Sequence, residues 1–584
     1  MKKLITLLCL LYAGPGSALE VTIHLQYWLD EIVETYTSLS EEYIYLDDDS
    51  DTQLGDVLDS NTSVNAVRSG GVGSQTSVFT RGTNSNHTMV SINGSAITDH
   101  STTNGATDFG MINTNWADSL HVVEGPMSTL YGADAVAGVV DIKTRKEYQS
   151  NLITGVGSNG KHKLGYSTQI GSDKEFDFGF YTERTDGIST YPQGTERDGN
   201  ILNSFNVGYT GQINDTTFNI LGVHTAQVTD LDGGSSDDTD YTADTKFTFG
   251  QWRSSTDTDY GKIDLTIDKT VWDREYVNGT EIDVYDSHSD HIKVVNTNKH
   301  DSINTTLGVD YLLYSATFDN TGSYTSSVDK DATQSGIFAN VDYKLSDSAT
   351  TTIGYRVDDN SMHGTQQTYR LGASYTVNQH TWYSSVATGY KNPTMYEMYG
   401  ADNFGYTGNA DLNPELSYSR EIGYKHQQFD IAVYDTVIKD MITYGNSTYS
   451  NDTAGSSTMQ GFDVNHKFNF HKLHIENSYS HVHAVNSSGT WLKRRPHDTI
   501  RSSVTYATKN WWVKPSVLHY GKHADTHATN YSTIHIKERT TANLSAGYGN
   551  FVLDIKNVFD DTYERPHGYN QGGRTFDLTY SIRF

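Results

Sequence analysis

Two polar stretches of this 584-residue chain gather carboxylates around glycine-containing turns. The shorter stretch, Gly194–Gly199, contains Glu196 and Asp198. The longer stretch covers residues 227–246 and holds Asp230, Asp232, Asp237, Asp238, Asp240 and Asp244. Calcium takes six to eight oxygen ligands, and acidic side chains spaced around tight turns can supply them. Both loops are therefore candidate calcium sites, and solvated acidic loops are the alternative.

Histidines are the second group with potential chemistry. Five of them fall in one stretch, at His466, His471, His474, His481 and His483. Alternating positions of a strand share a face, so positions 481 and 483 would lie together and the others would not. This pattern favours surface or lumen histidines over a haem site. No Ser/His/Asp arrangement or metal motif has catalytic spacing, and we do not expect an enzyme.

The N-terminus has the pattern of an export signal. A basic start, Met1–Lys3, precedes the apolar run Leu4–Tyr12, and Gly16–Ala18 offers small residues for cleavage after residue 18. The apolar run is too short for a membrane helix. The single cysteine, Cys9, lies inside it, so the mature chain would have no thiol. The net charge of −29 argues against nucleic-acid binding, which needs the opposite sign.

Residues 147–584 read as a transmembrane β-barrel. The chain has 40 Tyr, 51 Gly and only 8 Pro, a mixture that favours strands with aromatic girdles. Apolar and polar residues alternate in Ile263–Ile267 and in the final Phe576–Phe584. Further expected strand segments are Phe176–Tyr181, Phe205–Tyr209, Phe218–Val223, Thr258–Thr266, Thr305–Tyr311 and Thr351–Val357. At roughly 20 residues for each strand and its connection, the region has room for about 22 antiparallel strands.

Residues 46–146 predict a small α+β domain ahead of the barrel. Its densest part has a strand at His121–Glu124, a turn at Gly125–Pro126, a short helical turn, and a second strand at Gly138–Ile142. Leu54–Leu58 has helical spacing. A barrel of this size is wide enough to need a plug.

The stretch Ser77–Lys143 resembles the plug domain of TonB-dependent outer-membrane receptors. The matching features are Arg81-Gly82, the strand and turn at Met89–Gly94, and the Glu-Gly-Pro run from Glu124 with its following Tyr-Gly and glycine turn. Asn93 stands where that family usually has Asp, and Ala137 where it usually has a second Gly. The terminal Phe584 resembles the signal for barrel insertion. The resemblance implies an all-β barrel closed by an N-terminal plug in the outer membrane of a Gram-negative bacterium, as a monomer.

The same resemblance assigns residues 19–45 to a periplasmic segment. Asp30-Glu31-Ile32-Val33-Glu34-Thr35 lies where the family has its TonB box, which pairs with the TonB energy-coupling protein. An extended, β-branched segment suits strand addition to a partner sheet. An ordinary first strand of the plug is the alternative.

Within the family, the chain most resembles the cobalamin (vitamin B12) receptors. The matches are Ser77–His87, Asp358–Ser361, Tyr390–Pro393, Leu412–Glu415 and Leu492–Pro496. This resemblance implies substrate contacts by Ser77, Asn84, Thr102, Thr103 and Arg494. It also implies loop-ordering calcium at Glu196, Asp198, Asp230 and Asp244. Local turn bonds for Ser77 and Asn84, and plug pairing for Arg494, remain open as alternatives.

Two rival functions follow from the same residues. A ferric siderophore or haem receptor would share the plug, the barrel and the TonB box. A non-transporting adhesin or passive porin would have no use for a TonB box. The function we expect is active import of a scarce large nutrient, with cobalamin first among the candidates.

Overall fold

The computed structural model describes residues 40–46, 53–144, 150–171, 175–232, 236–238, 240–321, 327–402 and 405–584. All of them lie in the second of the two units into which the chain divides, Leu39–Phe584. The expected signal segment and the expected TonB box, Asp30–Thr35, lie outside the described residues.

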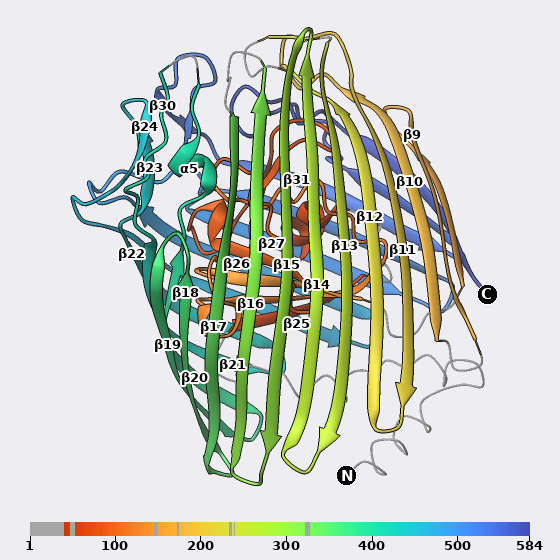
Figure 1. The fold of residues 1–584 in the computed structure, drawn as a ribbon. Coiled ribbons are helices and arrows are strands. Elements are labelled where there is room, and N and C mark those ends of the chain that lie inside the picture. The colour runs from red at the N-terminus through yellow and green to blue at the C-terminus, as the bar shows by residue number, and fades with distance from the viewer. Residues whose placement is uncertain are drawn as a thin grey trace. The chain divides into compact units, whose positions relative to one another are not determined.

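Antiparallel strands close into the barrel of Figure 1. In chain order they are β8 (Asn151–Gly157), β9 (Lys161–Ile170), β10 (Phe176–Ile188), β11 (Asp198–Ile213), β12 (Thr216–Asp230), β13 (Tyr241–Thr258), β14 (Gly261–Asn278), β15 (Glu281–Lys299), β16 (Ile303–Asn320), β17 (Ser327–Ser346), β18 (Ala349–Asn360), β19 (Gly364–Val377), β20 (His380–Lys391), β21 (Glu415–His426), β22 (Phe429–Lys439), β25 (Ser456–Phe470), β26 (Leu473–Val485), β27 (Asp498–Ala507), β28 (Trp511–Tyr520), β31 (Arg539–Tyr548), β32 (Phe551–Lys556) and β33 (Thr575–Arg583). The last strand pairs with the first, from Asp577 opposite Gly157 to Arg583 opposite Asn151, which removes both sheet edges. The expected 22-stranded antiparallel barrel is confirmed.

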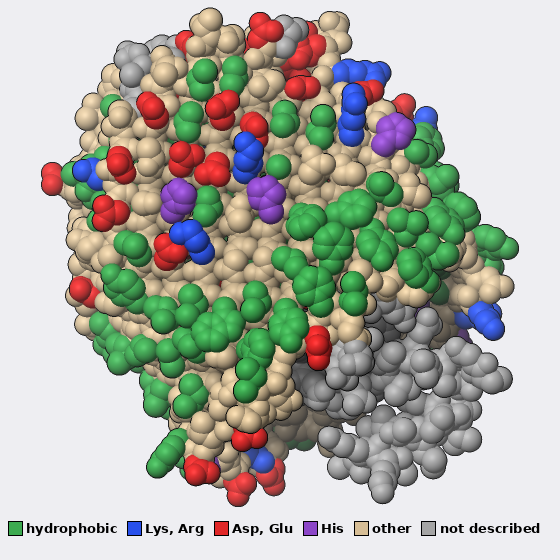
Figure 2. All heavy atoms as spheres, turned by 45° about the vertical axis from the view of Figure 1, so that its right-hand side comes forward, with side chains coloured by type: hydrophobic (Ala, Val, Ile, Leu, Met, Phe, Trp, Pro, Cys, Tyr) green, Lys and Arg blue, Asp and Glu red, His purple; other side chains and the backbone are tan. Residues whose placement is uncertain are grey.

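Alternation along each strand separates an outer from an inner face. On β14, Ile263 and Ile267 are 38% and 40% exposed, whereas Asp268 is 4% exposed and faces the lumen. Figure 2 shows hydrophobic side chains gathered in a band across the barrel wall, with acidic, basic and histidine side chains above it. Strands β14–β17 have 18 to 20 residues, more than the roughly 9–11 that cross a bilayer. They therefore extend beyond the apolar band.

The two ends of the barrel differ in their connections. One end, which we call the turn rim, has two-residue turns at 214–215, 259–260, 347–348 and 378–379. The other, the loop rim, has the long segments 392–414, 440–455, 486–497, 521–538 and 557–574. Within these long segments lie α5 (Met395–Tyr399) and two hairpins, β23–β24 (Ile442–Gly445, Thr448–Asn451) and β29–β30 (His523–Thr526, Thr533–Ile536).

The plug fills the lumen with a mixed sheet and short helices (Figure 1). Its elements are β1 (Ser40–Tyr45), α3 (Leu54–Asn61), β2 (Asn65–Arg68), β3 (Thr76–Phe79), η2 (Ser85–His87), β4 (Thr88–Ile92), β5 (Ser95–Ala96), β6 (Ala117–Glu124), α4 (Ser128–Tyr131) and β7 (Gly138–Thr144). The sheet order is β1-β6-β7-β4-β5, with only β4 and β7 parallel. Its core packs Leu54, Leu58 and Ile142 against Phe249 and Trp272 of the barrel wall. Plug and barrel thus share one apolar core.

Most local expectations match these elements. The strands expected at His121–Glu124 and Gly138–Ile142 are parts of β6 and β7, and the expected helix at Leu54–Leu58 is part of α3. The expected strand Thr258–Thr266 is wrong as one segment, because the chain turns at residues 259–260 between β13 and β14. The sheet begins at Ser40, ahead of the plug start expected at residue 46. No helix in the described part of the chain is long and apolar enough to cross a membrane.

Candidate functional site

The plug is fixed to the barrel wall by a buried arginine. Arg81 Nε lies 3.2 Å from Glu124 of the plug and 3.5 Å from Asp463 of β25, and its guanidinium also binds Glu421 of β21. The guanidinium lies over the Tyr434 ring, 4.5 Å from its centroid. Because these side chains are almost fully buried, removing the arginine would leave several carboxylates without a counter-charge.

A second polar contact, which we call the His87 centre, joins plug and barrel nearer the loop rim; His87 Nδ1 accepts a hydrogen bond of 3.2 Å from the Asn84 amide, so its Nε2–H faces the barrel. His87 Nε2 lies 2.5 Å from Glu415, the first residue of β21, and the two side chains are 0% and 2% exposed. The other carboxylate oxygen of Glu415 accepts a hydrogen bond of 2.7 Å from the Ile442 amide of β23. The plug is therefore connected through one carboxylate to a hairpin of the loop rim.

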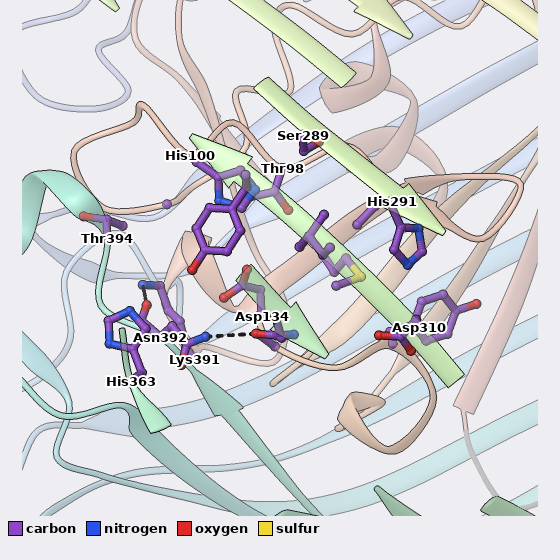
Figure 3. A pocket seen from close by; sticks show the side chains of 18 of the residues that line it. Thr98, His100, Asp134, Ser289, His291, Asp310, His363, Lys391, Asn392 and Thr394 are labelled. Carbon is purple, nitrogen blue, oxygen red and sulfur yellow. Dashed lines mark hydrogen bonds between the residues drawn. The ribbon is translucent and has the colours of Figure 1, made fainter. Parts of the chain in front are cut away.

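Beside this centre lies a crevice of about 100 Å³ between the plug and strands β15–β18 and β20 (Figure 3). Its lining includes His100 and Gly105 of a plug loop, Thr394 of the loop rim, and Met89 of plug strand β4. Gly105 has a φ of +76°, and a Cβ there would lie 3.2 Å from Thr394. Glycine thus lets the plug loop approach the barrel segment that carries Lys391.

Most charges around the crevice are already paired. Arg356 forms ion pairs with Asp310 at 2.8 Å and Asp358 at 2.6 Å. Arg274 pairs with Asp99 at 2.9 Å. Burial lowers the pKa of His100 to about 4 and that of His363 to about 4, so both rings are neutral at pH 7. These side chains are therefore already paired or neutral, and other polar groups that line the crevice would have to bind a ligand.

The expected substrate residues lie in three places. Ser77 is half-buried in β3, and Asn84 Oδ1 accepts a hydrogen bond of 2.6 Å from Arg495. Thr102 Oγ1 donates to the Asp99 carbonyl at 3.1 Å, while the Thr103 carbonyl accepts from Thr394 Oγ1 at 3.0 Å, above the crevice. Arg494 Nε pairs with Asp525 at 3.0 Å, and its side chain is 34% exposed.

No hydrogen bond within the described part of the chain joins any two of these five residues. Of the paired arginines, Arg495 makes the side-chain contact with the plug and also donates to the Gly82 and Thr83 carbonyls, whereas Arg494 contacts the plug only through its carbonyl, which accepts from Asn65 at 3.2 Å. The segment Tyr390–Pro393 was matched to the cobalamin receptors in the sequence, but no role was predicted for Lys391 or Asn392. Spacing alone carried no signal that would have placed them in a cavity.

The acidic loops converge on one cluster. Oxygens of Glu196, Asp198 and Asp232 lie within 4.8 Å of one another. Glu196 Oε2 and Asp198 Oδ1 are buried and have no hydrogen-bond partner among the described residues. Burial and the neighbouring carboxylates of Asp232 and Asp237 raise the pKa of Glu196. This set of hard oxygen donors fits a calcium ion.

The other two expected calcium ligands are placed differently. Asp230 Oδ2 accepts a hydrogen bond of 3.1 Å from the Gly199 amide, next to the cluster. Asp244 lies on β13 between Ala243 and Thr245, whose side chains face inward, and it pairs with Lys246 at 3.4 Å. Strand alternation therefore turns Asp244 away from the lumen. The structure places Asp232, rather than Asp244, with Glu196 and Asp198.

The five histidines do not form a group. His466, His471 and His474 lie near the turn rim, whereas His481 and His483 lie near the other end of β26. The His466 ring stacks on Phe429, and His481 Nδ1 lies 2.9 Å from Asp498. They contact separate partners rather than one shared ligand space.

Comparison with known proteins identifies the class. Residues 30–139 match the family "TonB-dependent Receptor Plug Domain", and residues 147–558 match "TonB dependent receptor-like, beta-barrel". The chain belongs to the TonB-dependent receptors. It is therefore an outer-membrane protein of a family of transport receptors, and the loop rim is its extracellular end.

Two curated relatives are similar to the chain over most of its length. The chain is 28% identical to the vitamin B12 transporter BtuB of Photobacterium profundum, covering 89% of this chain and 88% of that protein. It is 25% identical to BtuB of Vibrio cholerae, covering 91% and 90%.

Solved structures show the fold. The siderophore receptor PirA of Acinetobacter baumannii superimposes with a TM-score of 0.79 at 17% identity, over 93% of this chain and 98% of that one. The ferric enterobactin receptor PfeA of Pseudomonas aeruginosa gives 0.78 at 16%, over 94% and 100%. At these identities the likeness concerns the fold alone.

Proposed function

We propose that this receptor imports cobalamin across the outer membrane, driven by the TonB energy-coupling protein. The observation that carries the proposal is the similarity to vitamin B12 transporters over about nine-tenths of both chains. A ferric siderophore is the second candidate, and the structural neighbours give it only the shared fold.

The proposed cycle begins at the extracellular face. Cobalamin binds the plug loop that carries Thr102 and Thr103, the segment around Ser77 and Asn84, and the barrel loops near Arg494. Binding makes Asp30–Thr35 available in the periplasm, where TonB adds it as a strand to its own sheet. Force transmitted through this segment then displaces the plug, opening the wide barrel that surrounds it.

Calcium is part of the proposal as an ordering ion. Glu196, Asp198 and Asp232 would hold it, with Asp230 adjacent. A bound divalent cation would neutralise the clustered carboxylates and hold the segment of Glu196 and Asp198 against that of Asp232. The buried, unpartnered oxygens of Glu196 and Asp198 support this role.

Equilibrium titration of purified receptor with cyanocobalamin, with and without calcium, tests the proposal. Tight binding strengthened by calcium is expected. Tight binding indifferent to calcium would remove the metal from the proposal, and absence of binding would remove cobalamin. Ferric enterobactin and haem, titrated in parallel, identify the cargo class in that last case.

Energy coupling is tested in cells that lack their own cobalamin receptor. Expression of the parent chain should restore cobalamin-dependent growth, whereas Ile32→Pro should not, since proline cannot donate a strand hydrogen bond. Asp290→Asn on the outer wall, where Asp290 is 54% exposed and pairs with Lys269, is the matched control. Equal growth with Ile32→Pro would contradict a TonB box at this place.

A further inference from the structure

Two acceptor groups that line the crevice beside the His87 centre, the Asp134 carboxylate and Asn392 Oδ1, receive no hydrogen bond from the described residues, and the ammonium of Lys391 lies near both. Lys391 is 1% exposed; its ammonium donates to the Asn392 carbonyl at 2.9 Å and lies 4.0 Å from Glu397. The Asp134 carboxylate accepts no hydrogen bond from a described residue, although its backbone amide is bound to the Tyr390 carbonyl. Asn392 Oδ1 is buried and unpartnered, while its amide nitrogen donates to Gln334 at 3.3 Å.

These groups face one space. Figure 3 shows Asp134, Lys391 and Asn392 together on one side of the crevice, with His363 beside them. Asp134 and Lys391 influence each other electrostatically without forming an ion pair within 4 Å. A gap therefore separates a carboxylate from an ammonium, and a molecule between them could contact both.

The chemistry of that gap selects a neutral ligand. A cation bound there would be repelled by Lys391. An anion would be repelled by Asp134 and would leave Asn392 Oδ1 without a hydrogen-bond donor. Both arrangements are unfavourable for buried groups. A primary carboxamide presents an NH₂ to the two acceptors and a carbonyl oxygen to the ammonium. The crevice volume of about 100 Å³ is several times the roughly 15 Å³ that one water molecule needs.

We propose that the crevice is a subsite for a neutral primary carboxamide arm of the substrate, held between Asp134, Asn392 and Lys391. The inference rests on the proposed function, because a corrinoid carries several such arms on its ring. Gly105, two residues after Thr103 in the plug loop, lines the crevice together with Thr394, which donates to the Thr103 carbonyl. An arm entering there would reach the plug next to Asp134 and the His87 centre.

The subsite also explains a choice between cargoes. A polyanionic iron chelate presents anionic oxygens at its periphery, and it has no primary carboxamide arm to donate to Asp134 and Asn392. Its carboxylate or phenolate oxygens would meet Lys391 only at the cost of approaching Asp134. The crevice thus favours an amide-rich, uncharged periphery over an anionic one.

The test compares cyanocobalamin with its monocarboxylic acid derivatives, in each of which one primary amide has been hydrolysed. Binding to the parent receptor is measured first by equilibrium titration. We expect at least one derivative to bind about tenfold or more weakly than cyanocobalamin. In that derivative the new carboxylate replaces an amide that donated to Asp134, so a charge-assisted hydrogen bond becomes a repulsion between two carboxylates. Derivatives whose altered arm points elsewhere should bind within about threefold of cyanocobalamin.

The variant Asp134→Asn tests the residue itself. It should weaken cyanocobalamin binding by about tenfold and reduce the penalty for the sensitive derivative to about threefold or less. The control Asp290→Asn makes the same carboxylate-to-amide change on the outer wall and should change neither value. Heat-dependent gel migration and thermal unfolding verify that both variants are folded.

Each possible outcome either supports or overturns the proposed subsite. A sensitive derivative whose penalty shrinks in Asp134→Asn supports the subsite. Equal binding of all derivatives, or a penalty unchanged by Asp134→Asn, overturns the subsite and leaves cobalamin import standing. Failure of the parent receptor to bind cyanocobalamin overturns the proposed function and the subsite together.

Discussion

Replacing His87 with leucine should loosen the plug while leaving the barrel intact. The variant His87→Leu leaves Glu415 buried without its 2.5 Å partner. Leaving a buried acceptor without its hydrogen-bond donor costs about 1–3 kcal/mol, and more when the acceptor is charged. Glu415 keeps the Ile442 amide at 2.7 Å, and Lys391 remains near, so we expect a loss of about 3 kcal/mol.

The assay follows plug unfolding in urea. The only cysteine, Cys9, lies in the expected signal segment, so Ala135→Cys introduces a single thiol at a fully buried plug position. Its labelling rate reports plug opening, and heat-dependent gel migration reports the barrel. With a urea dependence of about 2 kcal/mol per molar, a loss of about 3 kcal/mol lowers the plug midpoint by about 1.5 M.

Two further variants make the result specific. His380→Leu, at the turn-rim end of β20 where His380 stacks on His426, should shift the midpoint by less than about 0.3 M. His87→Leu combined with Glu415→Leu should recover part of the loss, because no orphan charge remains buried. A single variant within about 0.3 M of the parent, or a double variant below the single one, would refute the reasoning.

Three other outcomes are expected. Calcium should raise the thermal midpoint of the parent and of Asp244→Asn but not that of Asp232→Asn; an equal calcium response in all three would contradict the Asp232 cluster. Because the pKa of His100 is about 4 in the folded plug and its ordinary value is 6.5, only the unfolded chain gains a proton between those values. Plug stability should therefore fall as pH drops from 6.5 to 4, by at most about 1.4 kcal/mol per pH unit from this group, and His100→Gln should flatten that slope in the urea assay. The variant Ile32→Pro, which should fail to restore growth, should still bind cyanocobalamin as tightly as the parent does in the equilibrium titration. Weaker binding would show a defect other than energy coupling.

Local pattern was sufficient for the architecture. Period-2 alternation in Ile263–Ile267 and Phe576–Phe584 depends only on neighbouring residues, and it predicted strands with one apolar and one polar face. Glycine and proline at Gly125–Pro126 likewise marked a turn between β6 and α4. The one wrong strand, Thr258–Thr266, arose because a two-residue turn interrupts the alternation too briefly to be seen.

The site depended on contacts between distant parts of the chain. The acidic loops were visible in the sequence, but the register of β13 turns Asp244 outward and leaves Asp232 with Glu196 and Asp198. Which of the paired arginine side chains contacts the plug was equally undetermined, since Arg494 and Arg495 are adjacent in sequence and their side chains bind different partners.

By itself, the sequence determined that this protein is an exported, plugged barrel of the TonB-dependent class, because signals, alternation and the plug motif are all local. Only the tertiary structure brought His87 to Glu415, 328 residues away, and set Asp134 across a crevice from Lys391. The physical reason is that closing the barrel around the plug fixes which inward side chains meet. Spacing along the chain does not encode that choice.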